Sequence, residues 1–282
     1  MTKTNQQKVK DFLINNGVII VMFILVIYTG FTSDNFFTKN NFMNILMNMS
    51  SRLVIALGIA GCVITAGCDL SAGRMIGFGA CISGMLLQRM DYSGKFFPDM
   101  QPLNVFVVAL IAMLVCAAFG TVTGFFIAYL NVPPFIATLA MMEIVYGIGL
   151  IVTNATPLGG YVEQYTNVSN GKFLGINYLI WIAIIVAAIT WFIFNMTRHG
   201  KYMYAIGGNP QAAEVAGVPV KATLILIYMK AAAMYGLAGF MLGAKAGGAS
   251  VSLGYGYEME AIAACTIGGV SVTGGRGKVS SA

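Results

Sequence analysis

The sequence predicts an all-α, polytopic transmembrane helical bundle, and three observations lead to this fold class. Hydrophobic residues make up 58% of the 282 residues and charged residues only 9%, and the mean hydropathy is +0.79, which lies outside the usage of soluble domains. Several apolar runs reach the roughly 20 residues that a helix needs to cross a bilayer. The runs show no alternation of period two, which argues against a β-barrel.

About eight apolar runs follow one another along the chain, and we expect each to form one span of a single transmembrane domain over residues 1–282. The runs lie near residues 17–32, 45–67, 72–88, 103–130, 135–153, 178–195, 222–244 and 257–272. Glycines gather within these runs, as in "GLAGFMLGAKAGG", and small residues permit close approach of helices in a membrane.

The orientation follows from the distribution of Lys and Arg, which are more frequent on cytoplasmic loops. No small-residue cleavage site follows the first run, so we expect an uncleaved first span and a cytoplasmic N-terminus. Span counting then places Lys3, Lys8, Lys10, Arg74, Arg198, Lys201, Lys221, Arg276 and Lys278 on inner segments, and Lys39, Arg52, Arg89, Lys95, Lys172 and Lys245 on outer ones. The modest excess inside favours this orientation. The cations are scattered, which gives no indication of a nucleic-acid partner.

The chain contains no recognisable catalytic or cofactor site, so we do not expect an enzyme. Its five cysteines fall inside apolar runs without a CxxC pair, and the single histidine, His199, has no neighbours for a metal cluster or a catalytic triad. "GGRGKVSS" at 274–281 only superficially resembles a phosphate-binding loop, because Val272 stands at the first glycine position and Val279 at the Ser/Thr position. We therefore expect no cofactor and no metal in this chain.

A short polar helix is predicted within "AIGGNPQAAEVAGVPVKA", residues 205–222, between two apolar runs. Asn209 is a favourable N-cap, Pro210 suits the first helical position, and Gly217 followed by Val-Pro is a strong stop. The helix of about seven residues would be roughly 10 Å long, too short to span a bilayer. A short isolated helix is marginal alone. It either rests on its own bundle or serves as a docking element for a cytoplasmic partner.

Four segments resemble, in the same order, the permease subunits of bacterial ATP-binding-cassette sugar importers. They are "TAGCDLSAGR" at 65–74, "AYLNVPPFIATLAMMEIVYG" at 128–147, "TRHGKYMYAIGGNPQAAEVAGVPV" at 197–220 and "YEMEAIAACTIGGVSVTGGRG" at 257–277. The similarity covers nearly the whole chain from about residue 36 onward. "DLSAGR", "LLQRMDYSGKFFPDM" and "AIAAC" are similar to the galactose/methyl-galactoside type, which implies galactose and related galactosides as cargo.

The resemblance also implies partners and a place for each. The family's permeases form homodimers in the bacterial inner membrane, bind a separate ATPase subunit that holds ATP and magnesium, and receive sugar from a periplasmic sugar-binding protein. The cytoplasmic coupling loop that contacts the ATPase corresponds to residues of about 196–221. Within this loop we expect the contact to involve Gly207, Gly208, Asn209, Pro210, Ala212, Ala213, Glu214 and Gly217.

Two features depart from the family pattern. Family members have about ten spans, whereas this chain ends at "GGRGKVSSA", which indicates truncation within an inner loop. Glu143 and Lys230 fall within apolar runs, where an ionisable residue is a functional candidate by default. They could pair with each other structurally. They could instead be the coupling machinery of a secondary transporter or channel, which is the alternative function. A structural or scaffolding membrane protein ranks third.

Four polar residues are candidates for the translocation path or a gate. Asp69 and Ser71 lie where the second run breaks and the third begins. Asp69 is either an N-cap that complements the helix dipole, or the polar end of a discontinuous helix at the path. Glu258 and Glu260 open the last run, where they would cap its N-terminus or line the outer mouth at which a sugar-loaded binding protein docks.

Overall fold

The computed structural model describes residues 17–33 and 35–277, and the chain divides into two units, residues 1–48 and 49–282. Lys3, Lys8, Lys10 and Lys278, which entered the prediction of orientation, lie outside the described residues. The first unit contains α2 (Gly17–Thr32) and the start of α3 (Lys39–Ile64). Asn41 lies in the first turn of α3 and makes two local bonds, from its backbone amide to Thr38 Oγ1 at 3.3 Å and from its side-chain amide to the Phe36 carbonyl at 2.8 Å.

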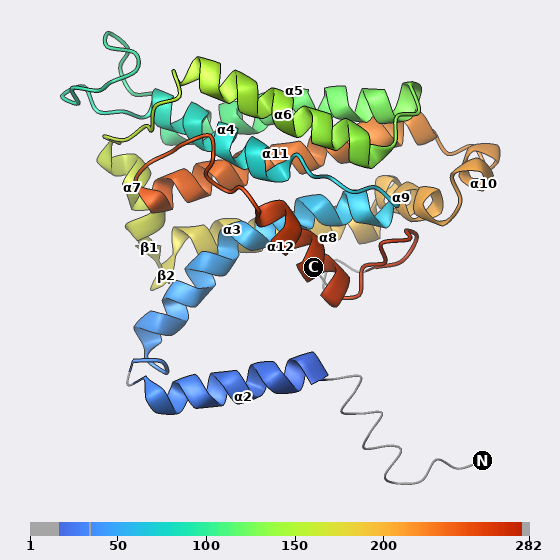
Figure 1. Ribbon diagram of the computed structural model, residues 1–282, viewed down its shortest axis with the longest axis horizontal. Helices are drawn as coiled ribbons and strands as arrows, with labels where there is room; N and C mark the ends of the chain where they lie inside the picture. The colour runs from blue at the N-terminus through green and yellow to red at the C-terminus, as the bar shows by residue number, and fades with distance from the viewer. Residues whose placement is uncertain (1–16, 34, 278–282) are drawn as a thin grey trace. The chain divides into compact units, whose positions relative to one another are not determined.

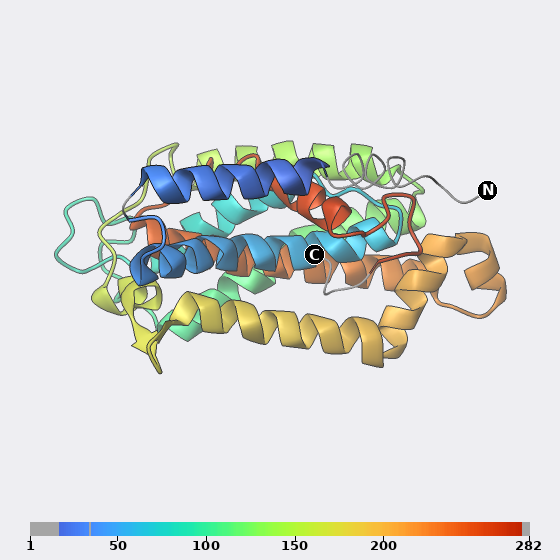
Figure 2. The same ribbon diagram turned by 90° about the horizontal axis from the view of Figure 1, so that it is seen from below.

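The second unit is a helical bundle in which the remainder of α3 is joined by nine further helices and one small hairpin among the described residues (Figures 1 and 2). The helices are α4 (Ala72–Leu86), α5 (Val105–Tyr129), α6 (Pro134–Val152), α7 (Glu163–Asn170), α8 (Tyr178–Met196), α9 (Arg198–Gly208), α10 (Pro210–Val215), α11 (Val220–Ala246) and α12 (Tyr257–Ile267). The hairpin pairs β1 (Lys172–Phe173) with β2 (Ile176–Asn177) antiparallel. The predicted all-α class is confirmed apart from this hairpin.

Helix α11 is the centre of the bundle and packs most extensively on α5 and α4. Small residues make this approach close. A side chain at Gly236 would lie 2.5 Å from the Ala112 carbonyl oxygen of α5, and one at Gly79 of α4 would lie 2.9 Å from the Gly236 carbonyl oxygen. Backbones therefore touch at both crossings, which confirms the expected role of glycines in helix packing. Large buried side chains of α11, including Tyr228 and Tyr235, fill the space beside these crossings.

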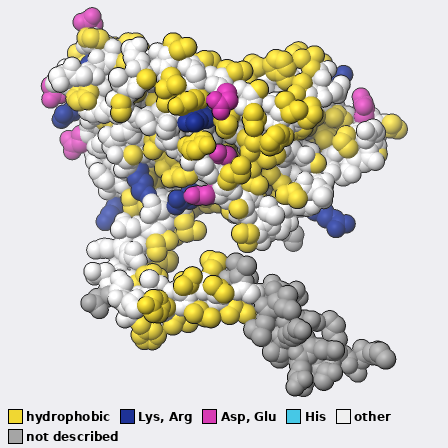
Figure 3. Space-filling model, in the orientation of Figure 1, with side chains coloured by type: hydrophobic (Ala, Val, Ile, Leu, Met, Phe, Trp, Pro, Cys, Tyr) yellow, Lys and Arg dark blue, Asp and Glu magenta, His cyan; other side chains and the backbone are white. Residues whose placement is uncertain are grey.

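The bundle has two distinct ends. We call the end with α7 and the hairpin the α7 end, and the end with α9 and α10 the α9 end (Figure 1). In the orientation predicted from the cations, the α9 end is cytoplasmic. Hydrophobic side chains cover much of the visible face, with few charged groups scattered between them, as expected of a surface in contact with lipid (Figure 3).

Five helices among the described residues are long and apolar enough to cross a membrane: α3, α5, α6, α8 and α11. The predicted runs at 72–88 and 257–272 form shorter helices, α4 with 15 residues and α12 with 11. At 1.5 Å per residue these helices are about 22 and 16 Å long, less than the roughly 30 Å of the hydrocarbon core. In each of these two runs the helix therefore covers only part of the thickness of the membrane, and extended chain covers the rest.

The extended segment before α4 begins at the α9 end and leads into the bundle. Its first residues lie beside the Ile64 carbonyl, which accepts a hydrogen bond from Gly275 N at 2.8 Å. Further on, Gly67 lies against the Tyr228 hydroxyl and Asp69 reaches Tyr235, both on α11. Helix α4 therefore starts in the interior, halfway along the bundle, and continues toward the α7 end (Figure 1).

The segment before α12 makes the complementary entry from the opposite end. Ala249 pairs with Leu158 at the α7 end, and Gly254 then packs against Ile76 of α4. Helix α12 starts beside the first turn of α4 and leads toward the α9 end, where Cys265 Sγ lies 3.3 Å from the Ala56 carbonyl of α3. The N-termini of two short helices thus meet inside the bundle, an arrangement typical of transporter sites.

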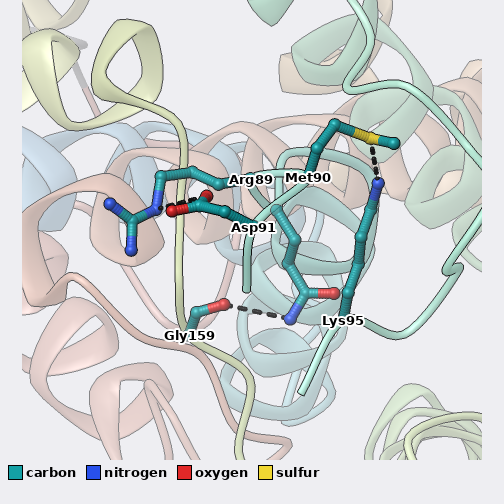
Figure 4. A network of polar contacts seen from close by, with 6 residues as sticks. Arg89, Met90, Asp91, Lys95 and Gly159 are labelled. Carbon is teal, nitrogen blue, oxygen red and sulfur yellow. Dashed lines mark hydrogen bonds and ion pairs between the residues drawn. The ribbon is translucent and has the colours of Figure 1, made fainter. Parts of the chain in front are cut away.

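Loops at the α7 end are tied together by polar contacts. Gln88 is buried and donates to the Gly159 carbonyl at 3.0 Å, while Arg89 N donates to the Gly160 carbonyl at 2.8 Å. Figure 4 shows Arg89 beside Asp91, at 3.6 Å, and Lys95 beside Met90. This network joins the loop after α4 to the loop after α6, so the outer surface of the predicted orientation is an ordered platform.

Candidate functional site

Asp69 is buried in the extended segment before α4 and makes three hydrogen bonds. Its Oδ1 accepts from Ser71 N at 3.0 Å and from Ser71 Oγ at 2.6 Å, and its Oδ2 accepts from the Tyr235 hydroxyl at 3.1 Å. The boundary residue of α4 is Ser71, whose side chain makes no capping bond. The prediction of Asp69 as the N-cap of this helix is therefore wrong by two positions. Asp69 instead organises the turn that precedes the helix and fastens it to α11.

Glu258 and Glu260, which we expected to share one role, are separated by the structure. Both oxygens of the buried Glu258 carboxylate accept from Gly256 N, at 3.3 and 3.1 Å, which satisfies a free amide at the start of α12. Gly256 has φ +90°, a conformation that favours glycine. Capping by Glu258 is confirmed. The alternative placement at an outer mouth stays a prediction.

Glu260 points away from the buried carboxylate and forms a surface ion pair. Its Oε2 accepts from Arg52 Nε of α3 at 2.9 Å, and about half of each side chain is exposed. The Arg52 guanidinium also lies over the Tyr257 ring, 5.1 Å from its centre. These residues border a cleft between α3 and α12 with a volume of about 310 Å³. An exposed ion pair of this kind contributes about 0–1 kcal/mol to the free energy of unfolding. Its main effect is therefore to orient α12.

The residue that the sequence analysis missed at this place is Arg74. It was counted as a cation on an inner segment, whereas the structure places it in the first turn of α4, inside the bundle. Its guanidinium carbon lies 3.8 Å from the ring centre of Tyr146 and 4.4 Å from that of Tyr255. Nη1 donates to Ser252 Oγ at 3.5 Å. The signal that could have revealed it is an arginine directly after a helix break within an apolar stretch.

The predicted polar helix is present at the α9 end as α10, with six residues. Asn209 Oδ1 accepts from Ala212 N at 2.9 Å, and Pro210 occupies the first helical position. Gly217 ends the helix with φ +81°, and Val218 N closes the turn onto the Ala213 carbonyl at 3.0 Å. Each of these three local predictions is confirmed.

Helix α10 is attached to the bundle by a single face. Ala213 is buried, while Pro210, Ala212, Glu214 and Gly217 are exposed, and the neighbouring Val215 is 91% exposed. Most of the surface of α10 is therefore free of contacts with the described part of the chain. Gly208 is exposed as well, with open space beside it. Gly207 is different, because it is buried against the Ile64 carbonyl and Gly275 and acts in packing.

Comparison with known proteins identifies the family. Residues 41–276 match the family described as branched-chain amino acid transport system / permease component. The chain belongs to this permease family. The galactose/methyl galactoside import permease protein MglC of Escherichia coli K12 is 40% identical over 99% of this chain and 85% of its own length, and that of Haemophilus influenzae is 41% identical over the same shares. The ribose import permease protein RbsC of E. coli K12 is 32% identical over 96% of this chain and 82% of its own length. No solved structure matches.

The two intramembrane charges of this permease do not form a pair within the chain. Glu143 is exposed on α6, and Lys230 of α11 lines a groove with His199 of α9, so the two lie in different surroundings. The described residues contain no ion pair between them. The predicted structural pair is therefore wrong. The reason is that α6, which carries Glu143, packs on α4 and α5, whereas the face of α11 that carries Lys230 lies against α3, α8 and α9.

The cysteines of the permease lie where their apolar surroundings predicted. Cys62, Cys81, Cys116 and Cys265 are buried and Cys68 is half-buried. The described residues include no group of three or more His, Cys, Asp or Glu side chains placed to hold a metal ion. The candidate functional residues described above lie at two places, the meeting point of α4 and α12 and the exposed helix α10.

Proposed function

We propose that this chain is the permease subunit of an ATP-driven importer for galactose, methyl galactosides and related monosaccharides in a bacterial inner membrane. The observation that carries the proposal is the identity of 40% over 99% of the chain with a galactose/methyl galactoside import permease protein. Similarity of this extent includes both the segment before α4 and the loop with α9 and α10. The subunit itself transports and does not hydrolyse ATP.

The partners follow from the same proposal. A separate ATPase subunit, which binds ATP and magnesium, would dock on the α9 end, and a periplasmic sugar-binding protein would dock on the α7 end. A second copy of the permease would complete the translocation path. The ordered loops around Gln88 and Arg89 support the proposed outer docking surface, because a rigid platform loses little conformational entropy on binding.

Helix α10 is the proposed contact with the ATPase. Its N-cap and its C-terminal turn are hydrogen-bonded locally, so it holds its shape while most of its surface stays free. It follows directly on α9, which in turn contacts the central helix α11. A displacement of α10 by the ATPase would therefore be transmitted to α11, and through the Tyr235–Asp69 hydrogen bond to the start of α4. This chain of contacts supports coupling between ATP hydrolysis and the interior.

The test is uptake of radiolabelled galactose by proteoliposomes that contain this permease, the ATPase subunit and the sugar-binding protein. We expect uptake with a hydrolysis-competent ATPase and none with an ATPase variant that cannot hydrolyse ATP. Uptake that persists without hydrolysis, driven by an ion gradient, would contradict the proposal and favour a secondary transporter.

A second experiment isolates α10. Ala213→Pro removes the hydrogen bond from Ala213 N to the Asn209 carbonyl and costs about 3 kcal/mol locally. We expect the bundle to assemble normally while co-purification with the ATPase and sugar-stimulated ATP hydrolysis are lost. Gln211→Pro is the matched control, because it lies on the same exposed helix but in the first turn, where amides have no intrahelical partner. Undiminished ATPase binding by Ala213→Pro would show that α10 only rests on the bundle.

A further inference from the structure

Arg74 occupies an unusual environment at the meeting point of the two short helices. It lies in the first turn of α4, and its two aromatic neighbours come from elsewhere, Tyr146 from α6 and Tyr255 from the segment before α12. Glu258 of α12 lies close by, since a side chain at Gly73 would collide with its Oε2. Three parts of the chain that are far apart in the sequence therefore contribute polar or aromatic groups to one small region, which we call the Arg74 cluster: Arg74, Tyr146, Ser252, Tyr255 and Glu258.

The hydrogen-bonding capacity of Arg74 is largely unused. A guanidinium has five N–H donors, and the only hydrogen bond of its side chain among the described residues is the long one to Ser252 Oγ, at 3.5 Å. Its Nε is buried with no partner, and the described residues include no salt bridge to Arg74. A buried donor without a partner costs about 1–3 kcal/mol. A purely structural arginine in an apolar bundle would be expected to have its donors satisfied.

The cluster is open on one side. Tyr255 is 60% exposed and Arg74 is partly exposed, although the Nε atom itself is covered. The two rings hold the guanidinium plane by cation–π contact, which orients its donors without consuming them. A ligand that entered beside Tyr255 would therefore meet preorganised donors from Arg74, the hydroxyl of Ser252 and the face of an aromatic ring.

The mixture of groups favours a neutral ligand with several hydroxyls. Arg74 supplies donors, Ser252 and the tyrosine hydroxyls can both donate and accept, and the nearby Glu258 carboxylate only accepts. An anion would be disfavoured by Glu258, and a cation by Arg74. Aromatic ring faces suit the C–H face of a pyranose because that face is apolar. These are the complementary features of a monosaccharide.

We propose that the Arg74 cluster is a sugar-contact site within the translocation path, where Arg74 donates hydrogen bonds to sugar hydroxyls and Tyr255 packs against the sugar ring. The inference rests on the proposed function, because it assigns residues to the cargo of that importer. The proposal also gives a reason why the interruption before α4 and the interruption before α12 lie at the same place. Together they bring these groups to one region halfway along the bundle.

Uptake kinetics test the assignment in the complete complex. For Arg74→Gln and Tyr255→Leu we expect kcat/KM for galactose uptake to fall by at least about tenfold, the equivalent of roughly 1.4 kcal/mol, while binding-protein-stimulated ATP hydrolysis stays within about twofold. Tyr255→Phe keeps the ring and should therefore lose less uptake than Tyr255→Leu. A purely structural role would reduce uptake and ATP hydrolysis together, and unchanged uptake by Arg74→Gln would overturn the proposal.

Direct binding provides a readout that does not depend on the ATPase. In nanodiscs that contain the permease alone, methyl β-galactoside should slow maleimide labelling of Tyr255→Cys, with the wild-type chain as the background for the native cysteines. The anionic sugar galacturonate should protect less. Equal labelling with and without methyl β-galactoside, or stronger protection by galacturonate, would overturn the assignment. Failure of galactose uptake by the wild-type complex would instead contradict the proposed function.

Discussion

Two buried tyrosines on α11 give a sharp test of the contact between α11 and the start of α4. Tyr235 and Tyr228 lie two helical turns apart and are almost completely inaccessible to solvent. The Tyr235 hydroxyl donates to Asp69 Oδ2 at 3.1 Å, whereas the Tyr228 hydroxyl is buried without a hydrogen-bond partner in the described part of the chain. The same substitution, Tyr to Phe, should therefore have opposite consequences at the two positions.

The magnitudes follow from the hydrogen bonds. Tyr235→Phe leaves Asp69 Oδ2 buried without that donor, which costs about 1–3 kcal/mol in free energy of unfolding. Tyr228→Phe removes a hydroxyl that is already unsatisfied, so stability should stay the same or rise by up to about 1 kcal/mol. The two variants remove the same atom from the same helix at similar burial, and each controls for the other.

The assay is equilibrium unfolding in detergent, supplemented by a double-mutant cycle. Combining Tyr235→Phe with Asp69→Ala should give a coupling energy of at least about 0.5 kcal/mol, because the two residues are in direct contact. Tyr228→Phe with Asp69→Ala should give a smaller coupling. Equal destabilisation by both Phe variants, or additive losses for the Tyr235 pair, would refute the view that this hydrogen bond fastens α4 to α11.

Three further predictions concern other parts of the chain. Gly236→Leu would place atoms 2.5 Å from a backbone oxygen of α5 and should lower the free energy of unfolding by about 3 kcal/mol, measured by thermal unfolding. Gly147→Leu should be tolerated, because there is open space beside Gly147. Similar melting temperatures of the two variants would contradict the close crossing of α11 and α5. Asn209→Ala should cost about 1 kcal/mol and speed amide exchange in α10, while Asn209→Asp keeps the cap and should not. Burial, followed by the charge of Lys230, lowers the pKa of His199 from 6.5 to about 4, so NMR titration of this single histidine should show a midpoint near 4. Between pH 6.5 and pH 4 the unfolded chain then takes up a proton at His199 that the native chain does not. The free energy of unfolding should therefore fall as the pH falls through this window. A titration midpoint near 6.5 would refute the burial of His199.

Local sequence signals predicted the elements that depend on neighbouring residues. Asn209, Pro210 and Gly217 determine where α10 begins and ends, since capping and the left-handed turn use only atoms within a few residues. The break before α4 was visible for the same reason, as a polar interruption at Asp69 in an apolar stretch. The motifs that resemble importer permeases indicated the family, which the match over residues 41–276 confirms.

Side-chain partners could not be predicted in this way, because they join segments that are distant in the sequence. Glu143 and Lys230 are opposite charges in apolar helices and invited a pair, yet their helices face different neighbours. Arg74 was counted on an inner segment because charge counting has no information on depth within the bundle. Glu258 and Glu260 are two residues apart on a helix, and a step of about 200° separates two such positions, so one side chain is buried and the other reaches Arg52.

The sequence by itself determined that this protein is a helical membrane protein and where its helices are interrupted, since hydropathy, glycine and capping residues act over short distances along the chain. Its resemblance to a known family, and not its hydropathy, indicated a permease. The tertiary structure alone decided that the two interruptions meet, with Arg74 between Tyr146 and Tyr255 and with Asp69 bound to Tyr235. The physical reason is that α11 brings α4 and α5 close through its glycines, and this packing sets which polar groups face one another.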